Sequence, residues 1–123
     1  MTTRRDRRTL ERAIDEAGTV EKQAMAHYLL AVFHDNNSRE AEAIPHYERA
    51  LALGPDRNTQ VHALAWLASS LYKTNQPAVA LERVEQALSL VPGPDLTHFL
   101  LGLRRRIQAK LPGVHGSEDA VSK

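Results

Sequence analysis

Histidine is the residue type in this sequence that could most readily bind a metal or transfer a proton. The chain contains six histidines among its 123 residues, and imidazole is the commonest metal ligand in proteins. His27 and His34 are seven positions apart, which places them on one face of a helix. There is no H-E-x-x-H pattern and no local group of histidines with the spacing of a metal site. We therefore interpret them as packing or surface imidazoles and expect no metal.

Catalysis by other residue types finds no support in the sequence. The chain has no cysteine, which excludes disulfides, thiolate zinc sites and cysteine nucleophiles. No P-loop, G-x-S-x-G or G-x-G-x-x-G pattern occurs. Acidic and basic residues are interleaved, as they are on a solvated helix face. We expect a protein without enzyme activity and without a cofactor.

Two arginine runs, at residues 4–8 and 104–106, are the features that could bind phosphates. The formal net charge is only +1, however, whereas nucleic-acid proteins usually carry a clear basic excess. No aromatic residues are interleaved with the arginines, so stacking on bases is not expected. Nucleic-acid association is an alternative hypothesis, and it predicts only weak, salt-sensitive binding.

Helices must position these side chains, because helical periodicity dominates the sequence and no segment alternates like a strand. We predict six helices in one all-α domain over residues 1–111. A first helix at 3–17 is followed by helical hairpins at 20–55 and 58–92 and by a last helix at 95–111. Residues 112–123 have little to bury and are predicted to form a disordered tail.

The helix boundaries follow from residues that favour caps and turns. Pro77 is predicted in the first turn of the fifth helix, where its missing N–H costs least. Pro45 falls inside the third helix, where it removes one backbone hydrogen bond, and we expect a local bend with the helix continuing. The predicted N-caps, chosen for their side-chain oxygens, are Thr3, Thr19, Ser38, Asn58 or Thr59, and Asp95.

The sequence also bears on where the chain resides. No stretch approaches the length of a membrane span. The first residues carry charge without the apolar run of a signal peptide. We therefore expect a cytoplasmic protein with no membrane contact.

The two predicted hairpins share one pattern of small and large residues. Residues 40–55, EAEAIPHYERALALGP, return in altered form at 77–92, PAVALERVEQALSLVP, with an offset of 37. Small residues let helices approach closely, and large ones fill the gaps between them. The residues assigned to this repeat packing are Leu30, Ala31, Ala43, Tyr47, Ala50, Leu67, Ala68, Ala80, Val84 and Ala87.

At these positions the chain resembles the tetratricopeptide repeat, a helix–turn–helix unit of about 34 residues with the skeleton W-x2-L-G-x2-Y…A-x3-F…P. The seven places hold, in the first copy, His27, Leu30, Ala31, His34, Ala43, Tyr47 and Pro55, and in the second Leu64, Leu67, Ala68, Leu71, Ala80, Val84 and Pro92. His98, Leu101 and Gly102 fill the first three places again, with the usual 34-residue spacing.

The resemblance covers roughly residues 24–111 and extends to small bacterial tetratricopeptide-repeat proteins of uncharacterised role. It implies a right-handed helical solenoid in which two repeats are flanked by an N-terminal helix and a C-terminal capping helix. Repeats of this kind stack through neighbouring contacts.

The resemblance further implies a concave groove, lined by the first helix of each repeat, that binds a peptide or helix of another protein. We therefore expect a non-catalytic protein–protein interaction scaffold with an unidentified protein partner. Tyr28 and Val32 stand where some family members hold a peptide carboxylate with Lys and Asn, so that mode is not expected. The groove candidates are Met25, Tyr28, Val32, Asp35, His62, Ala65, Ser69, Tyr72, Phe99, Leu103 and Arg106.

Self-association is the remaining hypothesis, either beside peptide binding or as a purely structural homodimer module. The last helix carries more apolar residues than one neighbouring helix can cover, and the second helix has the same excess. A large exposed apolar patch usually marks an interface, and two identical chains most often close it with a two-fold axis. The residues concerned are Leu96, Phe99, Leu100 and Leu103, and Met25, Leu29, Val32 and Phe33.

Overall fold

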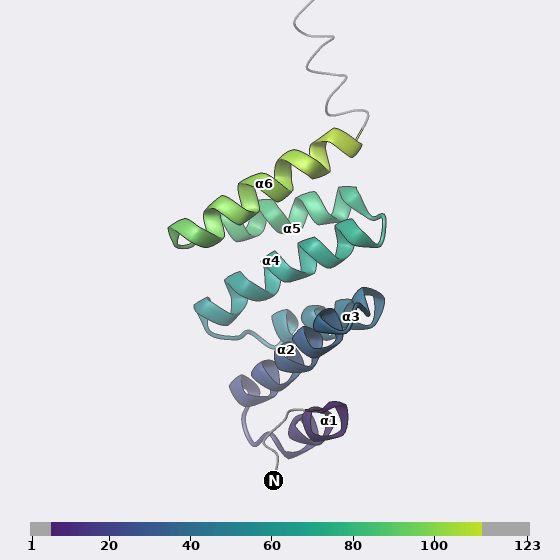
Figure 1. Ribbon diagram of the computed structural model, residues 1–123. Coiled ribbons are helices and arrows are strands. Elements are labelled where there is room, and N and C mark those ends of the chain that lie inside the picture. The colour runs from purple at the N-terminus through teal and green to yellow at the C-terminus, as the bar shows by residue number, and fades with distance from the viewer. Residues whose placement is uncertain (1–5, 112–123) are drawn as a thin grey trace, which may run out of the picture.

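The computed structural model describes residues 6–111, and within that range it contains six α-helices and no strand (Figure 1). The all-α prediction is therefore confirmed. Residues 1–5 and the predicted tail at 112–123 lie outside the described range. The helices are α1 (Arg7–Glu16), α2 (Val20–Asn36), α3 (Glu40–Ala52), α4 (Arg57–Lys73), α5 (Pro77–Ser89) and α6 (Pro94–Lys110).

The helices form one stack, with α1 at one end and α6 at the other (Figure 1). Each helix packs against the next one in the chain, and contacts also join α2 to α4 and α4 to α6. The helices α2, α4 and α6 therefore follow one another through the stack, as the repeat prediction requires. This arrangement is the tetratricopeptide-like helical repeat that the sequence pattern indicates.

The stack repeats with a period of 37 residues. The long helices α2, α4 and α6 each have 17 residues, and the short helices α3 and α5 each have 13. Val20, Arg57 and Pro94 begin the long helices, each 37 positions after the one before. The turns inside the two hairpins repeat too. Ser38 and Asn75, 37 positions apart, both have a positive φ angle, of 59° and 64°.

Helix α6 follows this 37-residue period and not the 34-residue spacing predicted from His98. Its first residue, Pro94, is 37 positions beyond the first residue of α4. Leu101, predicted to occupy a packing place, is 37% exposed. The spacing of 37 residues, three more than the usual 34, therefore recurs after each repeat. The apolar residues that α6 buries in the core are Leu100, Leu103 and Ile107.

Two helices begin with side-chain caps close to the predicted positions. Thr19 caps α2, because its Oγ1 accepts a hydrogen bond from the backbone N–H of Lys22 at 3.1 Å, and this prediction is confirmed. Asp6 caps α1 by accepting from the N–H of Thr9 at 2.9 Å, so the helix begins at Arg7. The predicted cap Thr3 lies outside the described residues.

The other predicted caps are wrong. Ser38 adopts the left-handed conformation in the turn before α3, and Arg39 stands at the N-cap position without a side-chain bond. Asp56 caps α4 through the N–H of Thr59 at 2.8 Å, so α4 starts before the predicted Asn58 or Thr59. Gly93 is the N-cap residue of α6, which leaves Asp95 inside the first turn. There its negative charge still favours the helix N-terminus.

Proline occurs at both kinds of position that the sequence predicted. Pro77 is at the start of α5, as expected. Pro45 lies inside α3, and the helix continues beyond it to Ala52. Burial of the apolar face on both sides of the proline outweighs the one backbone hydrogen bond that proline cannot make.

Alanines bring the helices of the stack together. Ala31, Ala43 and Ala50 of the first hairpin are completely buried, and so are their counterparts in the second. A fully enclosed alanine marks a close helix crossing, because there is no room for a longer side chain. All ten residues assigned to repeat packing are buried. Helix α1 adds one buried residue, Leu10, at its end of the stack.

Candidate functional site

A cavity of about 390 Å³ opens where α2, α4 and α6 follow one another, and we call it the α2–α4–α6 pocket. Three long helices and one residue of α3 contribute to it, so the stacking of successive repeats creates it. Its lining combines aromatic rings, a carboxylate, an ammonium group and an amide. The lining residues are Val32, Asp35, Asn36, Tyr47, Trp66, Ser69, Lys73 and Phe99.

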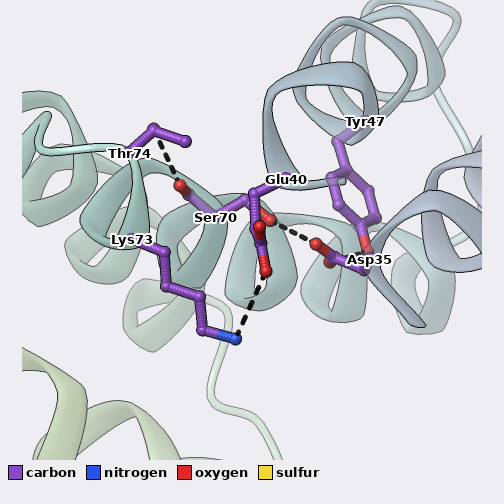
Figure 2. A network of polar contacts seen from close by, with 6 residues as sticks. All are labelled: Asp35, Glu40, Tyr47, Ser70, Lys73 and Thr74. Carbon is purple, nitrogen blue, oxygen red and sulfur yellow. Dashed lines mark hydrogen bonds and ion pairs between the residues drawn. The ribbon is translucent and has the colours of Figure 1, made fainter. Parts of the chain in front are cut away.

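Asp35 is fixed in the pocket by hydrogen bonds from two other helices. Its Oδ2 accepts from the Tyr47 hydroxyl at 2.6 Å, and its Oδ1 accepts from the Ser70 hydroxyl at 2.7 Å. Figure 2 shows the carboxylate between these two donors. The contacts join α2, α3 and α4 at the boundary between the two repeats. Short bonds to an ionised acceptor are among the stronger hydrogen bonds in proteins.

The Tyr47 phenol is a permanent donor in this network. Burial, followed by the hydrogen bond to Asp35, raises the pKa of Tyr47 far above its ordinary value. The hydroxyl therefore stays protonated at any physiological pH and continues to donate to Asp35. Burial also raises the pKa of Tyr28, although the hydrogen bond from Trp66 opposes the shift.

Aromatic side chains form the apolar part of the pocket. Trp66 of α4 and Phe99 of α6 meet edge to face, with ring centroids 5.2 Å apart and planes inclined by 66°. The indole Nε1–H of Trp66 donates to the Tyr28 hydroxyl of α2 at 3.2 Å. These contacts hold the indole in place, because both its polar edge and one side of its ring system have partners.

Charged groups stand at the rim of the pocket. The Lys73 ammonium lies 4.0 Å from a Glu40 carboxylate oxygen, and Figure 2 shows this pair beside the Asp35 network. The Lys73 side chain is 58% exposed, so the ion pair is weak. Outside the lining of the pocket, Lys110 of α6 lies over the ring of Tyr72, with its Nζ 5.2 Å from the centroid.

Four of the predicted groove residues line this pocket, namely Val32, Asp35, Ser69 and Phe99. Leu103, also predicted there, is only 1% exposed and offers no accessible surface. Predicted groove residues that are not among the lining of this pocket are Met25, Tyr28, His62, Ala65, Tyr72 and Arg106.

His62 lines a different depression, of about 570 Å³, between the first turns of α4 and α6. This depression is mostly apolar, with Val61, Pro92 and Leu96 among its lining. It lacks the fixed carboxylate and the aromatic pair of the α2–α4–α6 pocket, so the latter has the more selective chemistry.

Sequence reasoning missed Trp66 and Lys73 in the pocket and gave Tyr47 only a packing role. Transfer of the family positions selected Ala65, which is completely buried, and passed over its neighbour Trp66. The available signal was composition, because Trp66 is the single tryptophan of the chain. Tryptophan is enriched where one side of a residue is buried and the other meets a partner.

Three of the six histidines lie in the first hairpin, and none of these three lines the α2–α4–α6 pocket. His46 of α3 lies between His27 and His34 of α2, with ring centroids 5.3 and 5.8 Å away. The Nδ1 atoms of His27 and His46 are 3.1 Å apart, so one ring donates a hydrogen bond and the other accepts it. Within residues 6–111, no three histidine or carboxylate side chains form a group that could hold a metal ion.

Burial disfavours the charged form of these three imidazoles. Burial lowers the pKa of His27, His34 and His46. Repulsion from the neighbouring imidazole lowers the pKa further in two of them, His27 beside His46 and His46 beside His34. His34 is 3% exposed, and its buried Nδ1 has no hydrogen-bond partner in the described structure. Sequence spacing identified the shared face of His27 and His34 but gave no sign that His46 lies between them.

The apolar excess predicted for the last helix is reduced by packing within the chain. Leu100 and Leu103 are buried in the core, whereas Leu96 and Phe99 stay partly exposed against it. The arginines of the same helix lie at its surface, and Arg104 pairs with Glu85 of α5 at 3.2 Å. In the first arginine run, Arg7 pairs with Glu11 at 3.0 Å.

The comparisons with known proteins give a family for part of the chain. Residues 7–58 match the family model described as tetratricopeptide repeat. Over these residues the chain is similar to that family. The match includes α1, α2, α3 and the first residues of α4, so it begins earlier than the resemblance at residues 24–111 that the sequence pattern indicated. The second hairpin lies beyond the match, but its helices reproduce the first at the 37-residue period.

No curated protein and no solved structure matches the chain. Tetratricopeptide repeats generally mediate protein–protein interaction, and proteins of this family are typically non-catalytic scaffolds. None of the helices within residues 6–111 has the length and hydropathy of a membrane span.

Proposed function

We propose that the chain is a non-catalytic interaction module that binds a segment of a partner protein along α2, α4 and α6. The observation that carries the proposal is the α2–α4–α6 pocket, because residues of both repeats and of the last helix converge on it. A pocket of about 390 Å³ is within the size range of ligand sites in proteins and can take one large side chain.

The pocket is preorganised for binding. Asp35 is fixed by two hydrogen bonds, and Trp66 by its bond to Tyr28 and its contact with Phe99. Fixed side chains lower the entropic cost of binding, because they do not need to be ordered by the ligand. An aromatic group at the centre of a polar rim is also the usual composition of an interaction hot spot.

The surface beyond the pocket can extend the contact. Met25, Tyr28 and His62 are partly exposed on α2 and α4, and Tyr72 and Arg106 continue the series toward the far end of α4 and α6. These residues offer a mixture of apolar, aromatic and basic contacts to the rest of the segment. An extended peptide or a single helix would fit such a surface.

The experiment is a selection of peptides from a displayed random library with the purified chain, followed by binding measurements on the enriched peptides. Ser69→Arg is the test variant, because it fills the pocket without removing a core contact. Ser89→Arg on α5 is the matched control, since Ser89 is exposed and lies on a short helix.

We expect enriched peptides whose binding is lost in Ser69→Arg and retained in Ser89→Arg. Absence of any enrichment, or peptides that bind both variants equally, would contradict binding at this site.

A further inference from the structure

We infer that the α2–α4–α6 pocket anchors a cationic side chain of the partner segment, and arginine in preference to lysine. This inference rests on the proposed function and names the chemistry of the residue that enters the pocket. It combines three observations: the unpaired charge of Asp35, the aromatic rings beside it, and the pairing of Lys73 with another acid.

Asp35 provides a negative charge without a counter-charge. Its two hydrogen bonds come from the neutral hydroxyls of Tyr47 and Ser70, one to each carboxylate oxygen. Among residues 6–111, no lysine or arginine forms an ion pair with it. Each oxygen of a carboxylate can accept more than one hydrogen bond, so both oxygens keep capacity for a donor from a ligand.

Lys73 also lines the pocket, but its ammonium group lies at the exposed rim and is not paired with Asp35. Its ammonium group is paired with Glu40, which lies outside the lining of the pocket. Figure 2 shows Lys73 directed toward Glu40, whereas Asp35 is directed toward Tyr47 and Ser70. Taken together, the three charged groups leave one net negative charge, and it resides on the carboxylate that faces the cavity.

The aromatic rings favour a cation over other occupants. Trp66 and Phe99 line the same cavity as Asp35. A guanidinium group can stack on an aromatic face while its N–H groups bond to a carboxylate, which an ammonium group cannot do with the same geometry. An acidic side chain would be repelled by Asp35. A purely apolar one would remove water from the carboxylate without replacing its hydrogen bonds.

The single tryptophan makes the inference directly measurable, because the chain has one indole N–H signal and it arises from the pocket. The first probe is N-acetyl-arginine methylamide, titrated into the labelled chain while the Trp66 indole signal is followed by NMR. The matched probe is the citrulline derivative, which has the same shape without the charge, and the lysine derivative tests the preference between cations.

We expect saturable shifts of the indole signal with the arginine derivative. The lysine derivative should bind more weakly, and the citrulline derivative about tenfold more weakly or worse, as the loss of a charged hydrogen-bonded contact implies. Equal responses to arginine and citrulline, or no response to arginine, would overturn the inference.

Two variants test the role of Asp35 itself. Asp35→Asn keeps the size of the side chain and removes its charge, so it should abolish the difference between arginine and citrulline. Ser69→Arg leaves the Asp35 hydrogen bonds in place and brings a guanidinium into the cavity from α4. In that variant the indole signal should be displaced without any ligand and should no longer respond to the arginine derivative.

Failure of this inference can be told apart from failure of the proposed function. If the selected peptides lose binding in Ser69→Arg but lack arginine and lysine, a partner segment binds in the pocket and the cationic anchor is wrong. If they carry a basic residue whose replacement by citrulline removes binding, both statements hold. If no peptides are enriched, the proposed function fails, whereas the response of the Trp66 indole signal to the arginine derivative still decides whether the pocket binds a cation.

Discussion

The two hairpins of the stack have the same backbone and different chemistry between their helices. The alanines that set the helix crossings are common to both, and all are completely buried. The larger positions differ, because His27, His34 and Tyr47 of the first hairpin correspond to leucine or valine in the second. The small residues therefore fix the geometry, and the large ones can change from polar to apolar without altering it.

The difference leaves the first hairpin with groups that respond to pH and to the loss of single hydrogen bonds. It contains the row of three imidazoles and the bond from Tyr47 to Asp35. The places equivalent to His27, His34 and Tyr47 in the second hairpin, at Leu64, Leu71 and Val84, are buried hydrocarbon, whereas Arg83 stands at the place of His46. Matched substitutions in the two hairpins can therefore separate what the shared backbone contributes from what the polar contacts contribute.

The largest effect should come from overpacking, and it should be equal in the two hairpins. Ala50→Leu and Ala87→Leu each add volume at a completely enclosed crossing, so each should lower the free energy of unfolding by about 3 kcal/mol, at the upper end for overpacked cores. Urea denaturation measures the change. The controls are Ala41→Leu and Ala78→Leu, which are exposed on the same helices. A tolerated leucine in one hairpin alone would show that the crossings are not equivalent.

Loss of the Tyr47 hydroxyl should have the next largest effect, confined to the first hairpin. Tyr47→Phe removes a donor to the half-buried Asp35 carboxylate, and bonds to charged groups contribute about 2 kcal/mol to stability. Tyr72→Phe removes a hydroxyl from the second repeat and should cost less. Stability equal to that of the parent chain in Tyr47→Phe would mean that the Asp35 network does not help to join the repeats.

His34→Leu should stabilise the protein, because it introduces the residue that the second hairpin has at this place. The substitution removes a buried Nδ1 without a partner, and the gain should be about 1 kcal/mol at neutral pH. Destabilisation would indicate that His34 makes a favourable contact that leucine cannot replace.

The row of imidazoles should make the folded state sensitive to acid. Because burial lowers the pKa of His27, His34 and His46, the unfolded chain binds protons near pH 6.5 while the folded chain does not. The stability is therefore full above about pH 6.5 and declines as the pH falls below it. The charged groups near these rings are Glu11, Glu42, Arg7, Arg39 and Arg49.

Denaturation at a series of pH values above the range of the carboxylates measures this dependence. Replacement of His27 and His34 by leucine should reduce it, whereas His98→Gln, on the exposed surface of α6, should not. A pH profile that is the same in all three proteins would contradict the assignment to the first hairpin.

The smallest effect concerns the turns after the short helices. Gly54 and its counterpart Val91 both have positive φ, at 78° and 55°, and Val91 is 79% exposed. A β-branched residue in this conformation is strained by roughly 1–3 kcal/mol, whereas glycine loses about 0.5–1 kcal/mol of extra entropy on folding. With the strain at the low end of that range, Val91→Gly should raise the free energy of unfolding by at most about 0.5 kcal/mol, which is the difference between about 1 and about 0.5 kcal/mol. Gly54→Val should lower the free energy of unfolding. Denaturation of both variants should therefore show changes of opposite sign.

Local sequence determined the parts of the fold that could be predicted. Alternation of small and large residues at helical spacing is a property of single helices, so the number of helices and the packing alanines followed from it. The first residues of α3 and α6 could not be predicted from this pattern. Ser38 adopts the left-handed conformation in the turn before α3, and α6 begins with Pro94 after a glycine. Serine and aspartate favour both N-cap positions and turns, so their presence alone could not decide whether a given residue caps a helix or lies in the turn before it.

The candidate site was predictable only in part, because it depends on how each helix is rotated about its axis. Asp35 and Phe99 were assigned to the groove, whereas Trp66 was missed by one position in favour of Ala65. A rotation of one residue changes which side chain of α4 reaches the pocket. The contact between His27 and His46 was equally invisible, since it joins two helices through side chains that the sequence separates by a turn.

The arginine run on α6 takes on a different meaning once the 37-residue period is known. In that register, Arg104 and Arg105 stand where α4 has the buried residues Leu67 and Ala68, which receive the short helix of their own repeat. An arriving helix would have to desolvate two guanidinium groups, so the outward face of α6 resists further growth of the stack. A helix packed on this face would therefore meet two positive charges at the places where α4 offers hydrocarbon to its own short helix.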